Sequence, residues 1–223
     1  ARESLFCNLD QLQDVDDETF VTAEQALGDL EFLEAGDKAD DVLLAQLPAP
    51  MSAYQRAMRS GTEDVVRNVS VPRINDDTRM RLSGLPPGGN YRDLPESLKG
   101  RYLTGALWGP NNGSGRLGRQ HYYAYRRLHP KIWSWTLNTK ADSVYHYKHQ
   151  RALSVREFAR LQSFPDRFAF TVDQRRGELP GRISGGAGHS KYRQAGNAVP
   201  PLLARGIAEA LYRVLTANVK TRK

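Results

Sequence analysis

Hydrophobic residues at helical spacing mark the N-terminal part of the chain. A helix is predicted over residues 23–33 because apolar side chains recur there every three or four positions. A second short helix is predicted over residues 52–59 and should end before Gly61. The apolar face of the first helix consists of Ala26, Leu27, Leu30 and Leu33.

The middle of the chain has a different pattern. Residues 71–118 are rich in Gly, Pro and Asn, which suits a small irregular domain whose loops face a ligand. Residues 122–147 are predicted to be strand-like, since aromatic and β-branched residues alternate there with polar ones. Residues 174–189 are rich in Gly and Arg and are interpreted as a surface insertion. The strand-like residues are Ile132, Trp133, Trp135, Leu137, Val144, Tyr145 and Tyr147.

Two further helices are predicted near the C-terminus. Ser154 and Glu157 have the spacing of a capping box, so a helix should begin at Val155 and stop before Pro165. The last helix should begin at or just after Pro200-Pro201, because proline suits the first helical turn. Its apolar face would consist of Leu203, Ile207, Leu211 and Val214.

Charge is divided unevenly along the chain. The net charge of the 223 residues is +7. Residues 1–50 contain thirteen acidic and two basic residues, whereas the remainder contains twelve acidic and thirty basic residues. A basic excess of this size makes the remainder a candidate for binding a polyanion, and a solvated basic face is the alternative.

Several kinds of site and location are disfavoured. Cys7 is the only cysteine, which excludes an internal disulfide and a cysteine-rich zinc site, and it is interpreted as a small apolar residue. His146 and His149 have no clustered ligands beside them, so we predict no metal site. Residues 113–118 match a dinucleotide-binding glycine pattern, but no strand-to-helix context surrounds them, which indicates a flexible loop. No apolar run is long enough for a membrane span.

Two blocks near the C-terminus resemble those of a known family. Residues 194–201, Gln-Ala-Gly-Asn-Ala-Val-Pro-Pro, are similar to motif X of the DNA cytosine-5 methyltransferases, and residues 156–166 resemble motif IX. Weaker similarities extend the resemblance over essentially the whole chain. They are residues 1–6 (the end of motif VIII), 22–30 (the segment after it), 85–95 (the start of the target recognition domain), 135–137 (its Thr-Leu signature) and 151–157 (the lead into motif IX).

The resemblance implies an α+β fold with a defined domain order. A small irregular mixed target recognition domain would be joined to C-terminal helices that complete a Rossmann-like α/β methyltransferase domain. The expected divisions are residues 1–50, an acidic segment after motif VIII; 51–153, the target recognition domain; 154–193, the motif IX helix and insertion; and 194–223, motif X and the C-terminal helix.

The residues that perform the family's chemistry are missing from this sequence. The family uses a cysteine that follows a proline as its nucleophile, and a glutamate in a Glu-Asn-Val run. Here Cys7 follows Phe6, and no Glu-Asn-Val run occurs. We therefore expect a fragment or a separately encoded subunit that is inactive without a chain or segment carrying motifs I–VIII.

The resemblance also implies a cofactor and individual roles. Asn197 and Val199 would contact S-adenosylmethionine, and Gly196 would allow the close turn beside it; a turn or helix-cap role is the alternative for Asn197. Arg156, Arg160 and Gln162 of motif IX would make internal hydrogen bonds rather than read DNA.

Duplex DNA is the expected macromolecular partner. Basic side chains on the Gly-rich loops and strand-like segment can contact phosphates or guanine edges, and a solvated cation is the alternative at each position. Thr136 would lie near the backbone of the flipped nucleotide, with simple packing as the alternative. The candidate DNA-binding residues are Arg92, Arg116, Arg119, Arg126, Arg127, Lys131, Thr136 and Lys140.

The sequence is thus interpreted as the DNA-recognition half of a DNA cytosine-5 methyltransferase, either restriction-linked or epigenetic. A stand-alone sequence-specific DNA-binding or regulatory module is the alternative from another class, and RNA methylation is a third. The expected location is the cytoplasm, with the nucleoid, in a bacterium, or the nucleus in a eukaryote. The apolar face of the last helix should lack a cover until the motif I–VIII partner binds.

Overall fold

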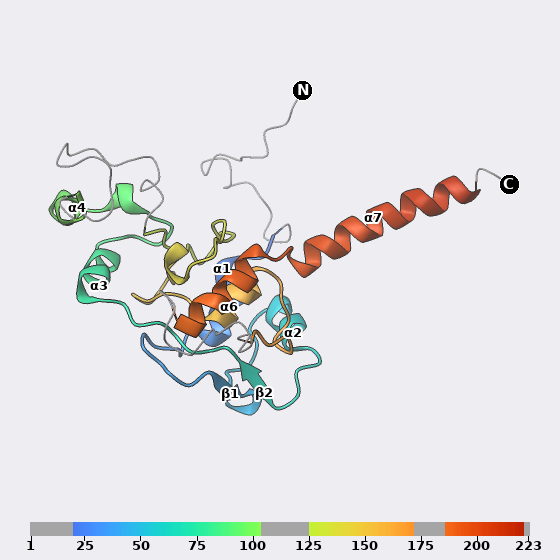
Figure 1. Ribbon diagram of the computed structural model, residues 1–223, viewed down its shortest axis with the longest axis horizontal. Coiled ribbons are helices and arrows are strands. Elements are labelled where there is room, and N and C mark those ends of the chain that lie inside the picture. Colours follow the sequence, from blue (N-terminus) through green and yellow to red (C-terminus); the bar gives the residue numbers. More distant parts are fainter. Residues whose placement is uncertain (1–19, 104–124, 172–185, 221–223) are drawn as a thin grey trace, which may run out of the picture.

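The computed structural model describes residues 20–103, 125–171 and 186–220 (Figure 1). These ranges contain helices joined by long irregular segments and one small sheet, which together form an α+β fold. The α-helices are α1 (Ala23–Leu27), α2 (Ala53–Arg59), α3 (Asp76–Ser83), α4 (Glu96–Leu103), α5 (Val155–Leu161), α6 (Gly186–Asn197) and α7 (Pro201–Lys220). The 3-10 helices are η2 (Gly28–Leu30), η3 (Leu44–Gln46), η4 (Tyr91–Asp93) and η6 (Ala141–Ser143).

The predicted N-terminal helix is present in two parts. Thr22 and Gln25 form a capping box that starts α1: the Thr22 hydroxyl accepts from the Gln25 amide at 3.1 Å, and the Gln25 side chain accepts from the Thr22 amide at 2.9 Å. α1 ends at Leu27, and η2 continues the chain in a tighter turn. The predicted apolar face is confirmed, because Ala26, Leu27, Leu30 and Leu33 are all buried.

The main hydrophobic core lies where α1, α5 and α6 meet. Its members include Leu27 from α1, Phe158 from α5 and Tyr192 from α6. A second cluster lies beside the sheet, in which β1 (Asp41–Leu43) pairs antiparallel with β2 (Val65–Arg67) and Val42 faces Val66. A third cluster packs under α3. The core therefore comes from chain segments far apart in sequence, as the central position of α1 and α6 in Figure 1 shows.

The prediction of strands over residues 122–147 is wrong for the described part of that segment. Instead of strands, residues 125–147 contain the 3-10 helix η6 and isolated bridges, which join Arg127 to Tyr145 and Tyr145 to Ala152. A turn in which the Ile132 amide donates to the His129 carbonyl interrupts the segment, and Pro130 has no amide hydrogen to give a ladder. The apolar alternation reflects burial from an irregular backbone, since Leu128, Val144 and Tyr147 all enter the main core.

The C-terminal helices were predicted with mixed success. α5 begins at Val155 and α7 at Pro201, as predicted. α6 was missed, because its residues were divided between a surface insertion and a turn. Helix α7 is 20 residues long and extends away from the other elements (Figure 1). Its first turn is tied to the body by the Leu202 amide, which donates to the Ser163 hydroxyl at 3.0 Å.

Candidate nucleic-acid interface and cofactor motif

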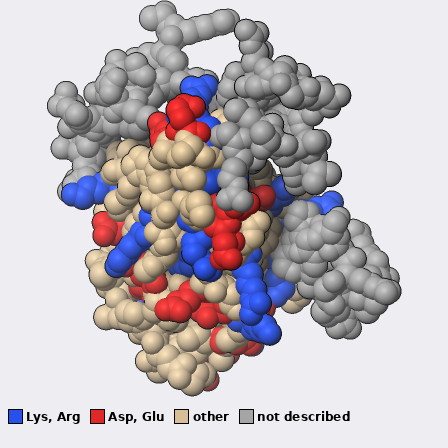
Figure 2. Space-filling model, turned by 90° about the vertical axis from the view of Figure 1, so that its left-hand side faces the viewer, with Lys and Arg blue, Asp and Glu red and all other residues tan. Residues whose placement is uncertain are grey.

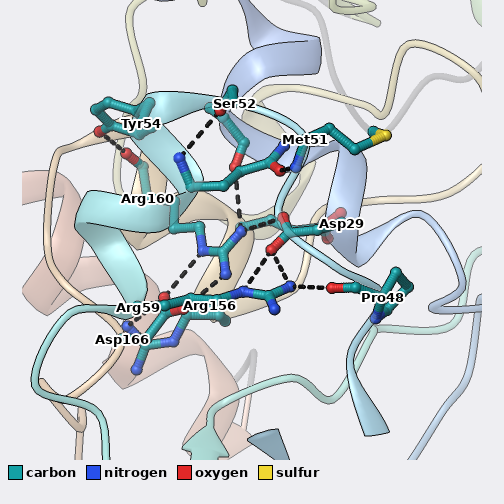
Figure 3. Close-up of polar contacts among 12 residues, drawn as sticks. Asp29, Pro48, Met51, Ser52, Tyr54, Arg59, Arg156, Arg160 and Asp166 are labelled. Carbon is teal, nitrogen blue, oxygen red and sulfur yellow. Dashed lines mark hydrogen bonds and ion pairs between the residues drawn. The ribbon is translucent and has the colours of Figure 1, made fainter. Parts of the chain in front are cut away.

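A buried arginine in α5 holds three parts of the chain together (Figure 3). The guanidinium of Arg160 donates to both carboxylate oxygens of Asp166, at 2.9 and 2.6 Å, and also to the carboxylate of Asp29. These three side chains are fully buried. Burial disfavours the charged form of Arg160, but the hydrogen bonds and charges of Asp166 and Asp29 outweigh it and raise the pKa of Arg160.

Two more arginines extend this network. Arg156 donates to the carbonyls of Arg67 at 2.9 Å and Pro165 at 3.1 Å, and also to that of Phe168. Its burial lowers the pKa of Arg156 to about 10. Arg59 of α2 pairs with the carboxylate of Asp29 from the other side (Figure 3). The prediction that Arg156 and Arg160 make internal hydrogen bonds is confirmed.

A second buried ion pair fixes the start of α5. Arg151 makes two 2.8 Å hydrogen bonds to the carboxylate of Glu157, which also accepts from the Ser154 amide in the predicted capping box. Although burial opposes ionisation, Arg151 lowers the pKa of Glu157. His146 lies beside the pair, and its burial lowers its pKa to about 3. His149 is also among the described residues. No cluster of three or more metal-ligating side chains exists in this part of the chain.

The proposed cofactor residues lie at the end of α6. The side chains of Asn197 and Val199 are exposed, just before α7 begins. Gly196 is half-buried, and a Cβ atom there would stand 2.1 Å from the backbone carbonyl oxygen of Asn138. Gly196 therefore provides close backbone approach, and the partner in that approach is the segment that carries Thr136. The arrangement brings the motif X residues and a predicted DNA-contacting segment side by side.

Most of the predicted DNA-contacting residues within the described ranges reach the surface. Arg92, Lys131, Thr136 and Lys140 are exposed. Arg126 is partly exposed; its guanidinium lies 6.0 Å from the Trp135 ring centroid and donates to the Thr136 carbonyl at 3.1 Å. The face of the molecule in Figure 2 has Lys and Arg side chains distributed among Asp and Glu. Arg116 and Arg119 lie outside the described residues.

Arg127 corrects one of the DNA-binding predictions. Its side chain is buried and donates to the backbone carbonyls of Leu82, Leu85, His146 and Lys148. Burial lowers the pKa of Arg127. A guanidinium that satisfies four carbonyls inside the protein is not available to a phosphate, so Arg127 is a structural residue that joins the end of α3 to residues 146–148.

A cavity of about 320 Å³ lies between α1, α2 and the segment that contains Thr136. Two of its walls are fixed, because the Tyr54 hydroxyl donates to the Arg160 carbonyl and the Trp135 indole donates to the Arg127 carbonyl. Sequence reasoning did not select Tyr54, since nothing in α2 marks a residue that meets α5 across the fold. The remaining lining residues are Val21, Ala26, Trp133, Ser134, Thr136, Leu137, Arg160, Leu161 and Gln162.

Helix α7 presents apolar side chains to solvent. Leu203, Ile207, Leu211 and Val214, the four residues of the predicted apolar face, are each more than half exposed. No helix in the described parts of the chain is both long enough and apolar enough to cross a membrane. A continuous apolar stripe that is exposed to solvent is typical of an interface with another protein segment.

Comparisons with known proteins place the chain in a family of DNA-modifying methyltransferases. The family model for C-5 cytosine-specific DNA methylases matches residues 52–213. The chain belongs to this family, as the motif IX and motif X resemblance predicted.

Several individual relatives are type II methyltransferases from bacteria. The type II methyltransferase M1.HphI of Haemophilus parahaemolyticus is 36% identical over 145 residues, covering 64% of this chain and 31% of that protein. M.Sau96I of Staphylococcus aureus is 34% identical over 175 residues, covering 74% and 34%. The chain therefore spans about a third of the length of these relatives.

A solved structure supports the fold. The crystal structure described as a DNA modification methyltransferase encoded within an E. coli prophage matches 93% of this chain and 53% of its own, with a TM-score of 0.54 and 20% identity. At that identity the likeness concerns the fold.

Proposed function

We propose that this chain is the DNA-recognition part of a DNA cytosine-5 methyltransferase and works with a segment that carries motifs I–VIII. The whole enzyme would transfer a methyl group from S-adenosylmethionine to cytosine in duplex DNA. The observation that carries this proposal is the exposed apolar stripe of α7, which follows Asn197 and Val199 directly. Packing the stripe against a catalytic segment would remove it from water and bring the motif X residues to that segment.

The motif X residues fit one side of a cofactor pocket. The exposed amide of Asn197 can both donate and accept hydrogen bonds, as the amino-acid end of S-adenosylmethionine requires. Val199 offers an exposed apolar surface two residues further on. The bound cofactor would supply the methyl group, and the motif I–VIII segment would supply the remaining walls. Among this chain's residues, Asn197 would orient the cofactor and Val199 would exclude water.

The exposed cations fit a DNA backbone beside the recognition segment. Lys131 and Lys140 lie on either side of Thr136 in sequence, and all three are exposed. Lysine can neutralise phosphates, and the Thr136 hydroxyl can donate to a phosphate oxygen. Arg92 would contact DNA from η4, within the stretch that resembles the start of the target recognition domain. These contacts would position the duplex while the catalytic segment acts on the target base.

The nucleophile would come from the partner segment. In the family a cysteine adds to carbon 6 of cytosine and makes carbon 5 reactive, after the base has left the duplex. The only cysteine here, Cys7, follows Phe6 and lacks the preceding proline. We therefore expect DNA binding without methyl transfer from this chain alone.

The test is methyl transfer from labelled S-adenosylmethionine to unmethylated DNA. Three samples are compared: this chain, a motif I–VIII segment encoded directly upstream, and the two mixed. Transfer only in the mixture supports the proposal. Transfer by this chain alone would overturn the assignment of the nucleophile to the partner. DNA binding without transfer in any sample would favour a stand-alone DNA-binding module.

A further inference from the structure

The contact between Gly196 and Asn138 is closer than any side chain would allow. A Cβ atom at Gly196 would lie 2.1 Å from the Asn138 carbonyl oxygen, 2.8 Å from its carbonyl carbon and 3.3 Å from the Thr139 Cα. These are backbone atoms, so no rotamer change can relieve the overlap. Any side chain at this position must therefore displace either helix α6 or the segment that contains Asn138.

Helix α6 is the firmly held side of this contact. Lys191 pairs with Asp40 at 2.6 Å, and the Gln194 amide donates to the Thr171 carbonyl at 2.8 Å. The buried Tyr192 hydroxyl donates to the Leu153 carbonyl, while Ala195 is fully buried in the main core. These bonds anchor the helix to three separate parts of the chain, so moving it would disrupt several contacts at once.

The segment of residues 136–140 is the softer side. Thr136, Asn138 and Lys140 are exposed, and only Leu137 anchors the segment in the main core. One bond reaches it from outside the segment: the Arg126 guanidinium, which is partly exposed, donates to the Thr136 carbonyl at 3.1 Å. The other bonds are local: the Lys140 amide donates to the Asn138 side chain at 2.9 Å, and the Ser143 amide donates to the Lys140 carbonyl at 3.2 Å. An added methyl group at Gly196 would therefore push this segment outward and leave Asn197 nearly in place.

We infer that Gly196 is a positioning residue for the DNA-contacting segment, although it belongs to the motif that serves the cofactor. The inference rests on the proposed function, because Thr136 and Lys140 are the DNA contacts that the displacement would move. The two neighbouring residues of motif X thus have different roles: Gly196 determines where DNA is held, whereas Asn197 determines how the cofactor is held.

The experiment compares Gly196→Ala, Asn197→Ala and Gly206→Ala. Gly206 is the matched control, because a Cβ there would meet nothing within 4 Å. Affinity of this chain for a labelled duplex pool, randomised around a central cytosine, is measured by fluorescence anisotropy. The KM for S-adenosylmethionine is measured on the mixture with the motif I–VIII segment. For Gly196→Ala we expect about tenfold weaker DNA binding and a nearly unchanged cofactor KM, since overpacking typically has effects of this order.

The opposite effects on DNA affinity and cofactor KM are expected for the adjacent residue, Asn197. Asn197→Ala should raise the cofactor KM and leave DNA affinity unchanged, while Gly206→Ala should leave DNA affinity unchanged. Adding Asn138→Gly to the Gly196→Ala variant should restore part of the DNA affinity, because a glycine lets the displaced segment adjust. A Gly196→Ala variant with a raised cofactor KM and normal DNA affinity would overturn the inference.

Hydrogen exchange tests the displacement without DNA or cofactor. In Gly196→Ala the amides of Asn138, Thr139 and Lys140 should exchange faster, with the amides of residues 192–195 unchanged. Loss of protection confined to α6 would refute the inference even if the proposed function is correct. Failure of the unmodified chain to bind DNA would instead refute the proposed function, and the exchange result would still decide whether the segment moves.

Discussion

Helices α5 and α7 differ in what they bury. In α5, charged side chains lie inside the protein, where Arg156, Glu157 and Arg160 are each fully buried with partners from this chain. In α7, leucine, isoleucine and valine side chains face solvent. Helix α5 needs no further partner, because each of its buried charges is paired within this chain. Helix α7 has its hydrophobic face uncovered, which is why we propose that it meets another segment.

The largest effect on stability is expected from removing the cation that pairs with the buried carboxylates beside α5. Replacing Arg160 by Met would leave Asp29 and Asp166 buried without their shared cation, although Arg59 still reaches Asp29. We expect the free energy of unfolding to fall by about 3–5 kcal/mol, measured by urea denaturation. Arg205→Met is the matched control, since its pair with Glu209 is exposed on α7 and should contribute nothing measurable. Equal stability of the two variants would contradict the account of α5.

A charge in the apolar stripe of α7 should weaken binding to the motif I–VIII segment and leave the stability of this chain unchanged. Ile207→Asp places a charge on the exposed apolar face and touches no core residue, so the stability of this chain alone should hardly change. Its affinity for the motif I–VIII segment should fall by about thirtyfold or more, the range of an interface hot spot, measured by titration calorimetry. Thr216→Asp adds the same charge on the other side of the helix. If both variants bound the segment equally, α7 would not be the docking surface.

A pH dependence should arise beside α5. The Nδ1 atom of His146 accepts from the amides of Lys148 and His149, at 3.0 and 3.3 Å, and its Nε2 atom lies 3.7 Å from the Glu157 carboxylate. Burial, opposed by Glu157, lowers the pKa of His146 to about 3, below the value near 6.5 of an unfolded histidine. Between these two pKa values, His146 therefore binds a proton in the unfolded chain but not in the folded chain. The resulting stability is present above pH 6.5 and is lost as the pH falls toward 3.

Between pH 7 and pH 5 we expect this residue to reduce the free energy of unfolding by about 2 kcal/mol. The measurement is urea denaturation across that range, comparing the unmodified chain with His146→Asn, whose side-chain oxygen keeps an acceptor. The variant should show a shallower slope. The less buried His149 also has a pKa lowered first by burial, so His149→Asn should change the slope less. An unchanged slope in His146→Asn would show that other groups take up the proton.

Local sequence signals predicted α5 and the start of α7 well. The Ser154 and Glu157 capping box and the Pro200-Pro201 pair act within a few residues, so no tertiary information was needed. Family motifs likewise indicated which residues of α5 turn inward. Where the determinant was local, the prediction agreed with the structure.

The features that sequence reasoning missed depend on distant partners. α6 begins in a Gly-rich stretch, and its helical state accompanies the burial of Tyr192 and Ala195 against α5 and α1. Arg127 resembles any surface arginine in sequence, yet two of its acceptors, Leu82 and Leu85, lie more than forty residues away. The close approach of Gly196 to Asn138 is also nonlocal. Such contacts become visible only when the fold is known.

The smallest effect on stability is expected at Ser163, which links α5 to α7. Ser163, just after α5, has a φ of +60° and accepts a hydrogen bond from the Leu202 amide at the start of α7. Ser163→Ala removes the hydroxyl and keeps the strained backbone, so we expect a loss of about 1 kcal/mol in the free energy of unfolding. Ser163→Gly also removes the hydroxyl but relieves the strain, because glycine adopts positive φ readily, and should lose less.

Thermal unfolding of the two variants measures the difference. The glycine variant should also loosen the first turn of α7, which hydrogen exchange at the Leu202 amide would detect, while the amides of α5 stay protected. If Ser163→Gly were the less stable of the two, backbone strain at this position would be negligible. If neither variant changed exchange at the Leu202 amide, the hydroxyl would not be the main link. In the expected case, the Ser163 hydroxyl holds the first turn of α7 against the rest of this chain.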